Sequence, residues 1–231
     1  MTPSTGQDVR HLWPPTFKAA IFDFDGTIAT TAPLWHEVDR AFLGARGIAM
    51  DVEYSRRLNI LGFAAGARYT IERYGLPESV EDVCLEWERM ARALYETKAT
   101  LRPGAYAYIR ALRDRGVPVA LATTNGRGVL DAMRSVDLDE IFDVRVHAGE
   151  LGVTKDAPDI YLKAAELLQA SPSSCIVFED ILAAARSARR AGALVCGVRS
   201  GDANQDPHEL RSNTDLWLDD WRDIAPVGKC A

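Results

Sequence analysis

Short apolar runs alternate with helical patterns along most of this chain, and this alternation constrains its fold more than any other feature. The runs typical of buried strands are residues 17–24, 117–123, 143–148, 175–180 and 193–198, with 215–218 as a candidate edge strand. Helical spacing covers residues 127–136, 158–170 and 181–192. Strands that alternate with helices of this length form βαβ crossovers. We therefore predict an α/β protein with a doubly wound (Rossmann-like) parallel sheet.

The stretch 32–100 interrupts this alternation with helical spacing and no clear strand. In its last helical segment, seven residues share one face at three-and-four spacing: Val80, Val83, Cys84, Trp87, Met90, Ala91 and Leu94. Such a stripe is more typical of the core of a small helical bundle than of a cofactor site. The predicted organisation is therefore an irregular N-terminal arm (1–17), a Rossmann-like catalytic core (18–31 and 101–231) and an inserted helical cap domain (32–100).

Composition narrows the class of protein. Hydrophobic residues make up 47% of the 231 residues and charged residues 26%, which is typical of a globular domain. The net charge of −6 predicts no dominant basic surface, so we do not expect nucleic acid as a partner. The first fifteen residues lack the apolar core of a signal peptide, and no apolar run is long enough to span a membrane. The four cysteines, which include Cys230, contain no CxxC pair. These features predict a cytoplasmic protein without disulfides or bound zinc.

Two aspartates follow the first predicted strand. Open α/β sheets bind ligands beyond the carboxyl ends of their strands, so Asp23 and Asp25 stand where a site is expected. The period-two alternation of a strand directs both side chains the same way. Two carboxylates this close repel each other unless a positive charge lies nearby. A pair of loop or helix-capping aspartates is the structural alternative.

Short polar side chains follow the second predicted strand. Thr123, Thr124 and Asn125 place hydroxyl and amide groups at an expected helix N-terminus, which suits an anion. The same residue types at this place are more often simple N-caps. We predict that these three residues bind an anion, which the family resemblance given below implies is a phosphate group.

Two further carboxylates and a lysine complete the set. Glu179 and Asp180 end the fourth predicted strand and need a cation or a cap, and Lys155 lies in a loop before a helix. A single lysine there is usually a solvated surface group. Chance could supply any one of these groups, but it rarely supplies the ordered set of carboxylates, hydroxyl and lysine at strand ends. If Lys155 is catalytic, as the resemblance given below implies, Lys155→Ala is expected to abolish catalysis with little change in thermal stability.

These motifs in this order resemble the haloacid dehalogenase-like superfamily of phosphotransferases over residues 17–225. FDFDGT (22–27) resembles the first motif of the family, Thr123 the second, Lys155 the third, and Glu179 with Asp180 the fourth. The helical insertion is similar to the cap of the phosphoglycolate phosphatase and β-phosphoglucomutase branch.

The resemblance implies a role for each residue. Asp23 would be the nucleophile that forms an aspartyl-phosphate, and Asp25 the general acid and base. Mg²⁺ would be held by the Asp23 side chain, the Asp25 backbone carbonyl and Asp180, with Glu179 assisting. Thr123 and Lys155 would hold the phosphoryl oxygens.

The expected function is a Mg²⁺-dependent phosphatase that hydrolyses a small phosphorylated metabolite, either a sugar phosphate or a compound like phosphoglycolate. A phosphomutase of the β-phosphoglucomutase type is the main alternative, although Trp35 and then His36 stand where that family has its cap-hinge histidine. A dehalogenase would not need Asp25. A receiver domain would lack the insertion, and a protein that only binds its ligand would not be expected to keep both Asp23 and Asp25. A monomer or a homodimer is expected.

Two short segments are predicted to move the cap, at residues 30–33 and 101–104, because proline and glycine interrupt regular structure there. Residues 59–68 are interpreted as a mobile loop that selects the substrate, since Gly62 and Gly66 lie in it. Arg68 would contact a distal anionic group there, but an arginine on a solvated helix face is the more common case.

Overall fold

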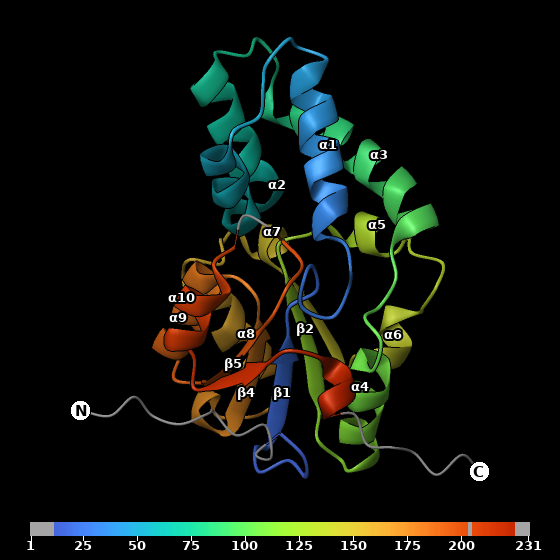
Figure 1. Ribbon diagram of the computed structural model, residues 1–231, viewed down its shortest axis with the longest axis vertical. Coiled ribbons are helices and arrows are strands. Elements are labelled where there is room, and N and C mark those ends of the chain that lie inside the picture. The colour runs from blue at the N-terminus through green and yellow to red at the C-terminus, as the bar shows by residue number, and fades with distance from the viewer. Residues whose placement is uncertain (1–11, 203–204, 225–231) are drawn as a thin grey trace.

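The computed structural model describes residues 12–202 and 205–224 (Figure 1). Six strands form one sheet in the order β3-β2-β1-β4-β5-β6, and each neighbouring pair is parallel. The strands are β1 (Ala19–Phe22), β2 (Val119–Thr123), β3 (Val144–His147), β4 (Cys175–Glu179), β5 (Leu194–Val198) and β6 (Leu216–Leu218). The prediction of a doubly wound parallel sheet is confirmed, and each predicted strand coincides with one of these six.

Ten α-helices are described. They are α1 (Ala32–Gly44), α2 (Val52–Tyr74), α3 (Val80–Lys98), α4 (Ala105–Asp114), α5 (Arg127–Leu130), α6 (Leu138–Ile141), α7 (Ala148–Leu151), α8 (Asp159–Leu167), α9 (Leu182–Arg190) and α10 (Pro207–Ser212). The short 3₁₀ helices are η2 (Pro172–Ser174) and η3 (Trp221–Asp223).

One predicted helix is shorter than its pattern indicated. Helical spacing covers residues 127–136, but α5 ends at Leu130. Beyond it, the Asp131 carboxylate lies 2.6 Å from Arg145 of β3, and the Ser135 hydroxyl donates to the Ala99 carbonyl oxygen at 3.2 Å. Tertiary contacts of this kind compete with helical hydrogen bonding, which explains why the local pattern overestimates the helix.

The side chains of the strands alternate between two hydrophobic layers. Phe22 and Phe178 stack at 4.8 Å between ring centroids on the face covered by α4 and η3. Ile21 and Val177 lie on the other face, which α8 and α9 cover. Because both faces are buried, the strands are apolar throughout rather than half polar.

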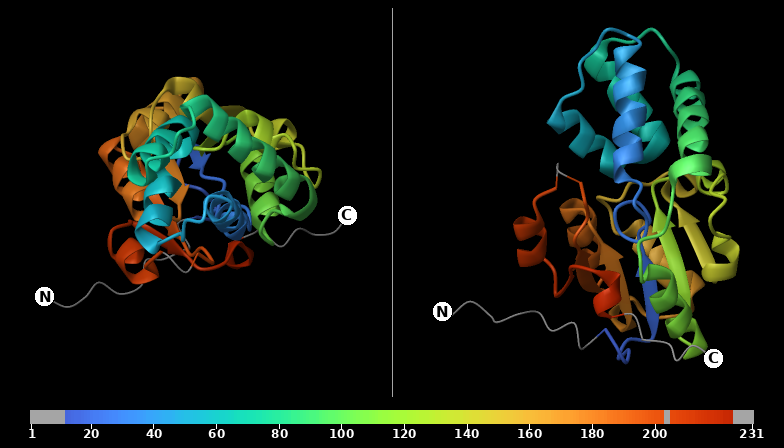
Figure 2. Two further views of the ribbon diagram at one scale, coloured as in Figure 1. Left: turned by 90° about the horizontal axis from the view of Figure 1, so that it is seen from above. Right: turned by 45° about the vertical axis from the view of Figure 1, so that its right-hand side comes forward.

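Helices α1, α2 and α3 lie together beyond the carboxyl end of the sheet (Figures 1 and 2). Their apolar faces meet at Trp87 of α3, whose ring centroid lies 5.5 Å from Phe42 of α1 and 6.4 Å from Phe63 of α2. A capping box between Ser79 and Asp82 begins α3. The amphipathic stripe predicted for this segment therefore packs against neighbouring helices. The assignment of 32–100 as a separate cap domain stays a prediction.

The expected loop at residues 59–68 is wrong, because these residues belong to α2. The helix is kinked at Gly62, where φ is 71° and ψ is −171°. A Cβ atom at this position would lie 3.1 Å from the Thr124 carbonyl oxygen, so glycine permits both the left-handed conformation and the close approach. Beside the kink, the Ile60 carbonyl accepts a hydrogen bond of 3.1 Å from the Lys155 backbone N–H. Residues 59–68 thus form a kinked helical segment that contacts Thr124 and Lys155 near the carboxyl ends of the strands.

The predicted arm is described only from residue 12 onward, and residues 1–11 lie outside the described part of the chain. Leu12 is buried, and its carbonyl accepts a hydrogen bond of 2.9 Å from the Tyr108 hydroxyl. Cys84, Cys175 and Cys196 are free thiols, while Cys230 lies beyond the described residues.

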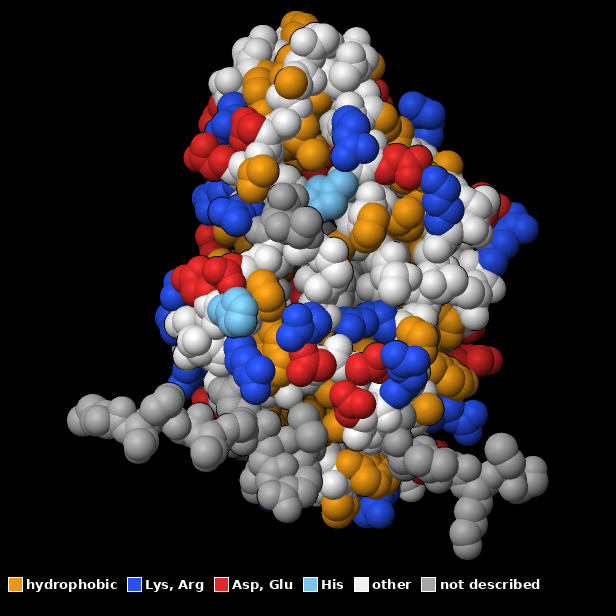
Figure 3. Space-filling model, viewed as in Figure 1, with side chains coloured by type: hydrophobic (Ala, Val, Ile, Leu, Met, Phe, Trp, Pro, Cys, Tyr) orange, Lys and Arg blue, Asp and Glu red, His pale blue; other side chains and the backbone are white. Residues whose placement is uncertain are grey.

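Surface charge and helix hydropathy are relevant to nucleic acid and to membranes, neither of which is an expected partner. On the face shown in Figure 3, acidic and basic side chains are interspersed, without a large area of positive charge. Within the described ranges, no helix is both long and apolar enough to cross a bilayer.

Candidate active site

Three carboxylates converge where β1 and β4 end. The two strands are neighbours, with Phe22 beside Phe178, so the residues that follow them lie at the same edge of the sheet. Asp23, Glu179 and Asp180 are buried, and each offers a ligand oxygen within 4.8 Å of the others. Gly26, at φ 83°, turns the chain against Asp180 so closely that a Cβ would clash with that carboxylate. This arrangement concentrates negative charge in the protein interior.

Lys155 is the cation that faces this cluster. Its ammonium donates to Asp23 Oδ1 and, at 2.6 Å, to Glu179 Oε1. The side chain is only 2% exposed, so it is not the solvated surface group that a single loop lysine usually is. Burial lowers the pKa of Lys155, but the attraction of Asp23 and Glu179 outweighs it, and the pKa is raised. The ammonium therefore stays charged between two carboxylates.

The partners of these carboxylates differ. Glu179 Oε1 also accepts a hydrogen bond of 2.7 Å from the Tyr161 hydroxyl, and Oε2 accepts from the Asp180 backbone N–H at 3.2 Å. Asp23 Oδ1 is held by Lys155, whereas Asp23 Oδ2 is buried without a hydrogen-bond partner in the described part of the chain. The pKa of Asp180 is raised by burial and by the nearby Asp23. Asp23 thus has one anchored oxygen and one oxygen that is available to a ligand.

Asp25 is held by donors from three parts of the chain. Its Oδ1 accepts from the Thr31 hydroxyl at 2.6 Å and from the Tyr95 hydroxyl of α3. Its Oδ2 accepts from the Asn125 amide at 2.5 Å. Burial, followed by repulsion from Asp23, raises the pKa of Asp25 to about 6 although these donors oppose the rise. A carboxyl group with this pKa exchanges its proton near neutral pH, as general acid–base catalysis requires.

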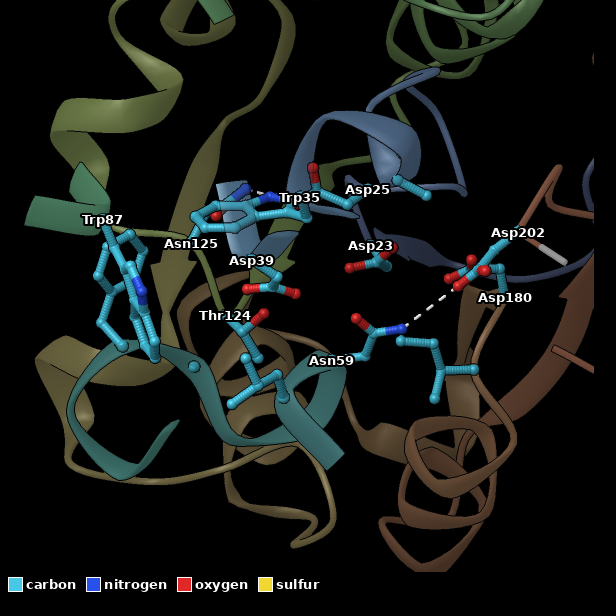
Figure 4. Close-up of a pocket in the computed structure, with 15 residues that line it drawn as sticks. Asp23, Asp25, Trp35, Asp39, Asn59, Trp87, Thr124, Asn125, Asp180 and Asp202 are labelled. Atoms are coloured by element: carbon cyan, nitrogen blue, oxygen red, sulfur yellow. Dashed lines mark hydrogen bonds between the residues drawn. The ribbon is translucent and has the colours of Figure 1, made fainter. Parts of the chain in front are cut away.

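A cavity of about 80 Å³ lies between the sheet edge and helices α1 to α3, and Figure 4 shows its lining. Asp23, Asp25 and Asp180 line it from the strand ends, and Thr124 and Asn125 from the segment after β2. Its other walls carry aromatic and acidic side chains of the three helices. No lysine, arginine or histidine stands among the described residues that line it.

A second set of contacts joins the helices to the loop after β5. Asp202 accepts from Asn59 of α2 at 3.4 Å and lies 3.1 Å from His36 Nε2 of α1. The hydrogen bond to Asp202 raises the pKa of His36, although burial lowers it. Asn59 and Asp202 line the cavity on the side of the core that carries β5.

The predicted site residues are distributed unevenly around the cavity. Asp23, Asp25, Thr124, Asn125 and Asp180 line it, whereas Thr123, Lys155 and Glu179 do not. The Thr123 hydroxyl oxygen accepts a hydrogen bond of 3.1 Å from the Asn125 backbone N–H, the contact expected of a local cap. Lys155 contacts the cavity residue Asp23 through its hydrogen bond to Oδ1, and Glu179 accepts a hydrogen bond from the same ammonium group. Arg68 is exposed and does not line the cavity.

Several residues in or beside the cavity are not indicated by any sequence motif: Thr31, Asp39, Tyr95 and Asp202. Tyr95 stands four residues after Ala91 on the apolar stripe of α3, and it is 1% exposed. Its hydroxyl accepts a hydrogen bond of 2.8 Å from Trp35 Nε1 while it donates to Asp25. The sequence signal that could have indicated this residue was a tyrosine hydroxyl on the otherwise apolar face of α3.

Comparison with known proteins gives consistent matches. A family model described as haloacid dehalogenase-like hydrolase matches residues 17–192. A putative phosphatase, YhcW of Bacillus subtilis, is 33% identical over 180 residues, which cover 76% of this chain and 80% of the relative. Hexitol phosphatase B of Escherichia coli O157:H7 is 29% identical over 212 residues, covering 88% of this chain and 93% of that protein.

The fold has solved counterparts. The crystal structure of CbbY from Rhodobacter sphaeroides in complex with phosphate superposes with a TM-score of 0.77 and 27% identity, over 92% of this chain and 97% of that one.

Proposed function

This chain belongs to the haloacid dehalogenase-like hydrolases, and from that premise we propose that it is a Mg²⁺-dependent phosphatase acting on a small phosphorylated metabolite through an aspartyl-phosphate. A phosphatase of small phosphorylated substrates agrees with the names of the relatives. One observation carries the proposed mechanism. Asp23 and Asp25 line the same cavity, and Asp23 has a carboxylate oxygen without a partner among the described residues, while Asp25 has a raised pKa.

The donor set fits a divalent cation. Asp23, Glu179 and Asp180 bring three buried carboxylates together, and Lys155 is the only cation that hydrogen-bonds to them in the described structure. Mg²⁺ prefers oxygen ligands and keeps several waters, so a few carboxylates suffice. We propose that Asp23, Asp180 and the Asp25 backbone carbonyl hold the ion, with Glu179 assisting. When bound, the cation would reduce the repulsion between the nucleophilic carboxylate and the phosphate dianion.

The first step follows from the positions of the two aspartates. A carboxylate oxygen of Asp23 attacks phosphorus, so that an aspartyl O–P bond forms while the P–O bond to the leaving alcohol breaks. Asp25 gives its proton to the leaving oxygen, and the alcohol departs neutral. Lys155 orients Asp23 through its hydrogen bond to Oδ1.

The second step regenerates the enzyme. Asp25, now ionised, takes a proton from water, and the resulting hydroxide oxygen attacks phosphorus. The aspartyl O–P bond breaks, which restores the Asp23 carboxylate and releases inorganic phosphate. The amide of Asn125 and the hydroxyl of Tyr95 keep the Asp25 carboxyl at its place in both steps.

The proposal is tested with Asp23→Asn, which keeps the size of the side chain and removes its nucleophilic charge. Wild type is expected to release phosphate from p-nitrophenyl phosphate and to show a phosphorylated aspartate by mass spectrometry after acid quenching. The variant should show neither. Asp114→Asn, the same change at an exposed helix end, is the matched control. Undiminished turnover by Asp23→Asn would disprove the mechanism, and conversion of β-glucose 1-phosphate into glucose 6-phosphate without phosphate release would favour a mutase.

A further inference from the structure

The part of the cavity wall formed by helices α1 to α3 has an unusual composition. We call it the distal wall and define it by Trp35, Asp39, Phe63 and Trp87. The rings of Trp35 and Phe63 meet edge to face at 5.6 Å between centroids, and Phe63 meets Trp87 in the same manner. These four residues present aromatic surface and one carboxylate to whatever is attached to the phosphate, and Leu58 and Asn59 of α2 line the cavity beside them.

Asp39 is buried and accepts no hydrogen bond from the residues that the structure describes. Its relative exposure is 4%, and burial raises the pKa of its carboxyl group. Figure 4 shows this carboxylate directed into the space between Trp35, Thr124 and Asp23. Buried polar groups in folded proteins are nearly always paired with protein groups or ordered water, and a ligand that enters this cavity can supply the donor that no described residue gives to Asp39.

Trp87 provides a second unpaired group on the same wall. Its indole Nε1–H is buried and has no acceptor in the described part of the chain. The ring packs edge to face against Phe42 and Phe63. An indole N–H is only a donor, and it therefore requires an acceptor from the ligand.

We propose that Asp39 and Trp87 select the alcohol part of the substrate, which is an uncharged polyol. Hydroxyl groups satisfy both side chains, because a hydroxyl donates to the Asp39 carboxylate and a hydroxyl oxygen accepts from the Trp87 N–H. An ammonium group would pair with Asp39 but leaves the Trp87 N–H without an acceptor. The inference rests on the proposed phosphatase function and narrows its substrate class.

The same wall disfavours a second anion. Phosphoglycolate-like compounds and bisphosphates carry another negative group, which ordinarily requires an arginine or a lysine as its partner. The cavity lining offers none among the described residues, and Asp39 and Asp202 add negative charge.

Three small monoesters with different end groups test the proposal. Glycerol 3-phosphate ends in a hydroxymethyl group, 3-phosphoglycerate in a carboxylate, and phosphoethanolamine in an ammonium group. We expect kcat/KM to be at least about tenfold higher for glycerol 3-phosphate than for either of the others. A tenfold difference corresponds to about 1.4 kcal/mol. In Asp39→Asn, kcat/KM for glycerol 3-phosphate divided by kcat/KM for 3-phosphoglycerate should be at least about fivefold smaller than in wild type, because the charge that repels the carboxylate is gone. Trp87→Phe should lower kcat/KM for glycerol 3-phosphate while the ratio of the other two stays constant.

The controls separate this inference from the proposed function. Asp114→Asn should leave all three ratios as in wild type, and thermal denaturation confirms that each variant is folded. Phosphate release from p-nitrophenyl phosphate reports on the chemistry alone. Suppose that p-nitrophenyl phosphate is hydrolysed but kcat/KM for 3-phosphoglycerate or phosphoethanolamine equals that for glycerol 3-phosphate, or that Asp39→Asn leaves the kcat/KM ratios unchanged. Either result overturns the inference while the phosphatase proposal stands. Absence of all turnover overturns both.

Discussion

Asp39→Asn is expected to stabilise the folded protein at alkaline pH and to change its stability little at acidic pH. Burial raises the pKa of Asp39 from 3.8 to about 7, and His36 opposes this only in part. A carboxyl group with a higher pKa in the folded state binds more protons folded than unfolded. The free energy of unfolding of wild type therefore falls as pH rises from 3.8 to about 7. Above that range the contribution of Asp39 to the free energy of unfolding stays constant.

The magnitude follows from the two pKa values. Since one pKa unit corresponds to about 1.4 kcal/mol, the ionised Asp39 costs the folded state about 4 kcal/mol at pH 8 and under about 1 kcal/mol at pH 4. Asparagine has nearly the same shape as the protonated carboxyl group and does not ionise. The difference between variant and wild type should therefore grow by about 3 kcal/mol between these two pH values.

The assay is equilibrium unfolding in urea, performed for both proteins at several pH values between the two limits. Groups that titrate elsewhere affect both proteins and cancel in the difference. A gain of about 4 kcal/mol at pH 8 would raise the melting temperature by roughly 8–16 °C in a domain of this size. Asp114→Asn measures the effect of the same substitution outside the cavity.

A stability difference that stays constant over the whole pH range would refute this reasoning. It would mean that the Asp39 carboxylate is paired or hydrated in the folded protein, so that its burial costs nothing. The proposed role of the distal wall would then lose its main support, because it depends on an unsatisfied carboxylate.

Three further predictions concern the strand ends. Lys155→Ala should cost roughly 3–5 kcal/mol of stability as well as catalysis, because it leaves two buried carboxylates without their cation; this reverses the sequence-based expectation, and urea unfolding with an unchanged midpoint would restore it. Mg²⁺ at about a hundred times its Kd should stabilise the folded protein by roughly 2.7 kcal/mol in thermal denaturation and EDTA should abolish turnover; an equal stabilisation of Asp180→Asn would remove that residue from the metal site. Tyr95→Phe should lower kcat roughly tenfold with little change in KM, because Asp25 loses one of its donors; steady-state kinetics equal to wild type would show that this hydroxyl is dispensable.

The fold could be predicted because its signals are local. Each strand is a short apolar run, and each major crossover helix has its own stripe of apolar residues, so the alternation can be recognised without knowledge of distant contacts. The polar strand ends could be recognised in the same way. In a parallel sheet the carboxyl ends of the strands meet at one edge, and Asp23, Thr124 and Asp180 were therefore expected to lie together.

The cavity walls could not be predicted in the same manner. Asp39 and Tyr95 lie on helices of the insertion, and the amphipathic pattern of a helix states which face is buried but not what that face meets. The kink at Gly62 is set by the approach of α2 to Thr124, which lies far away in sequence. The burial of Lys155 depends on two carboxylates from different strands.

Sequence alone thus determined the sheet, the order of its polar strand ends and the presence of a helical insertion, because each depends on neighbouring residues. Only the tertiary structure decided which side chains of the insertion face the carboxylates and that Lys155 is enclosed between two of them. It also decided that the Trp87 indole N–H is buried without an acceptor among the described residues, and that the Asp39 carboxyl group is buried with no hydrogen-bond donor among them. These properties arise from how helices pack across the sheet edge, and that packing depends on contacts between residues that are distant in the chain.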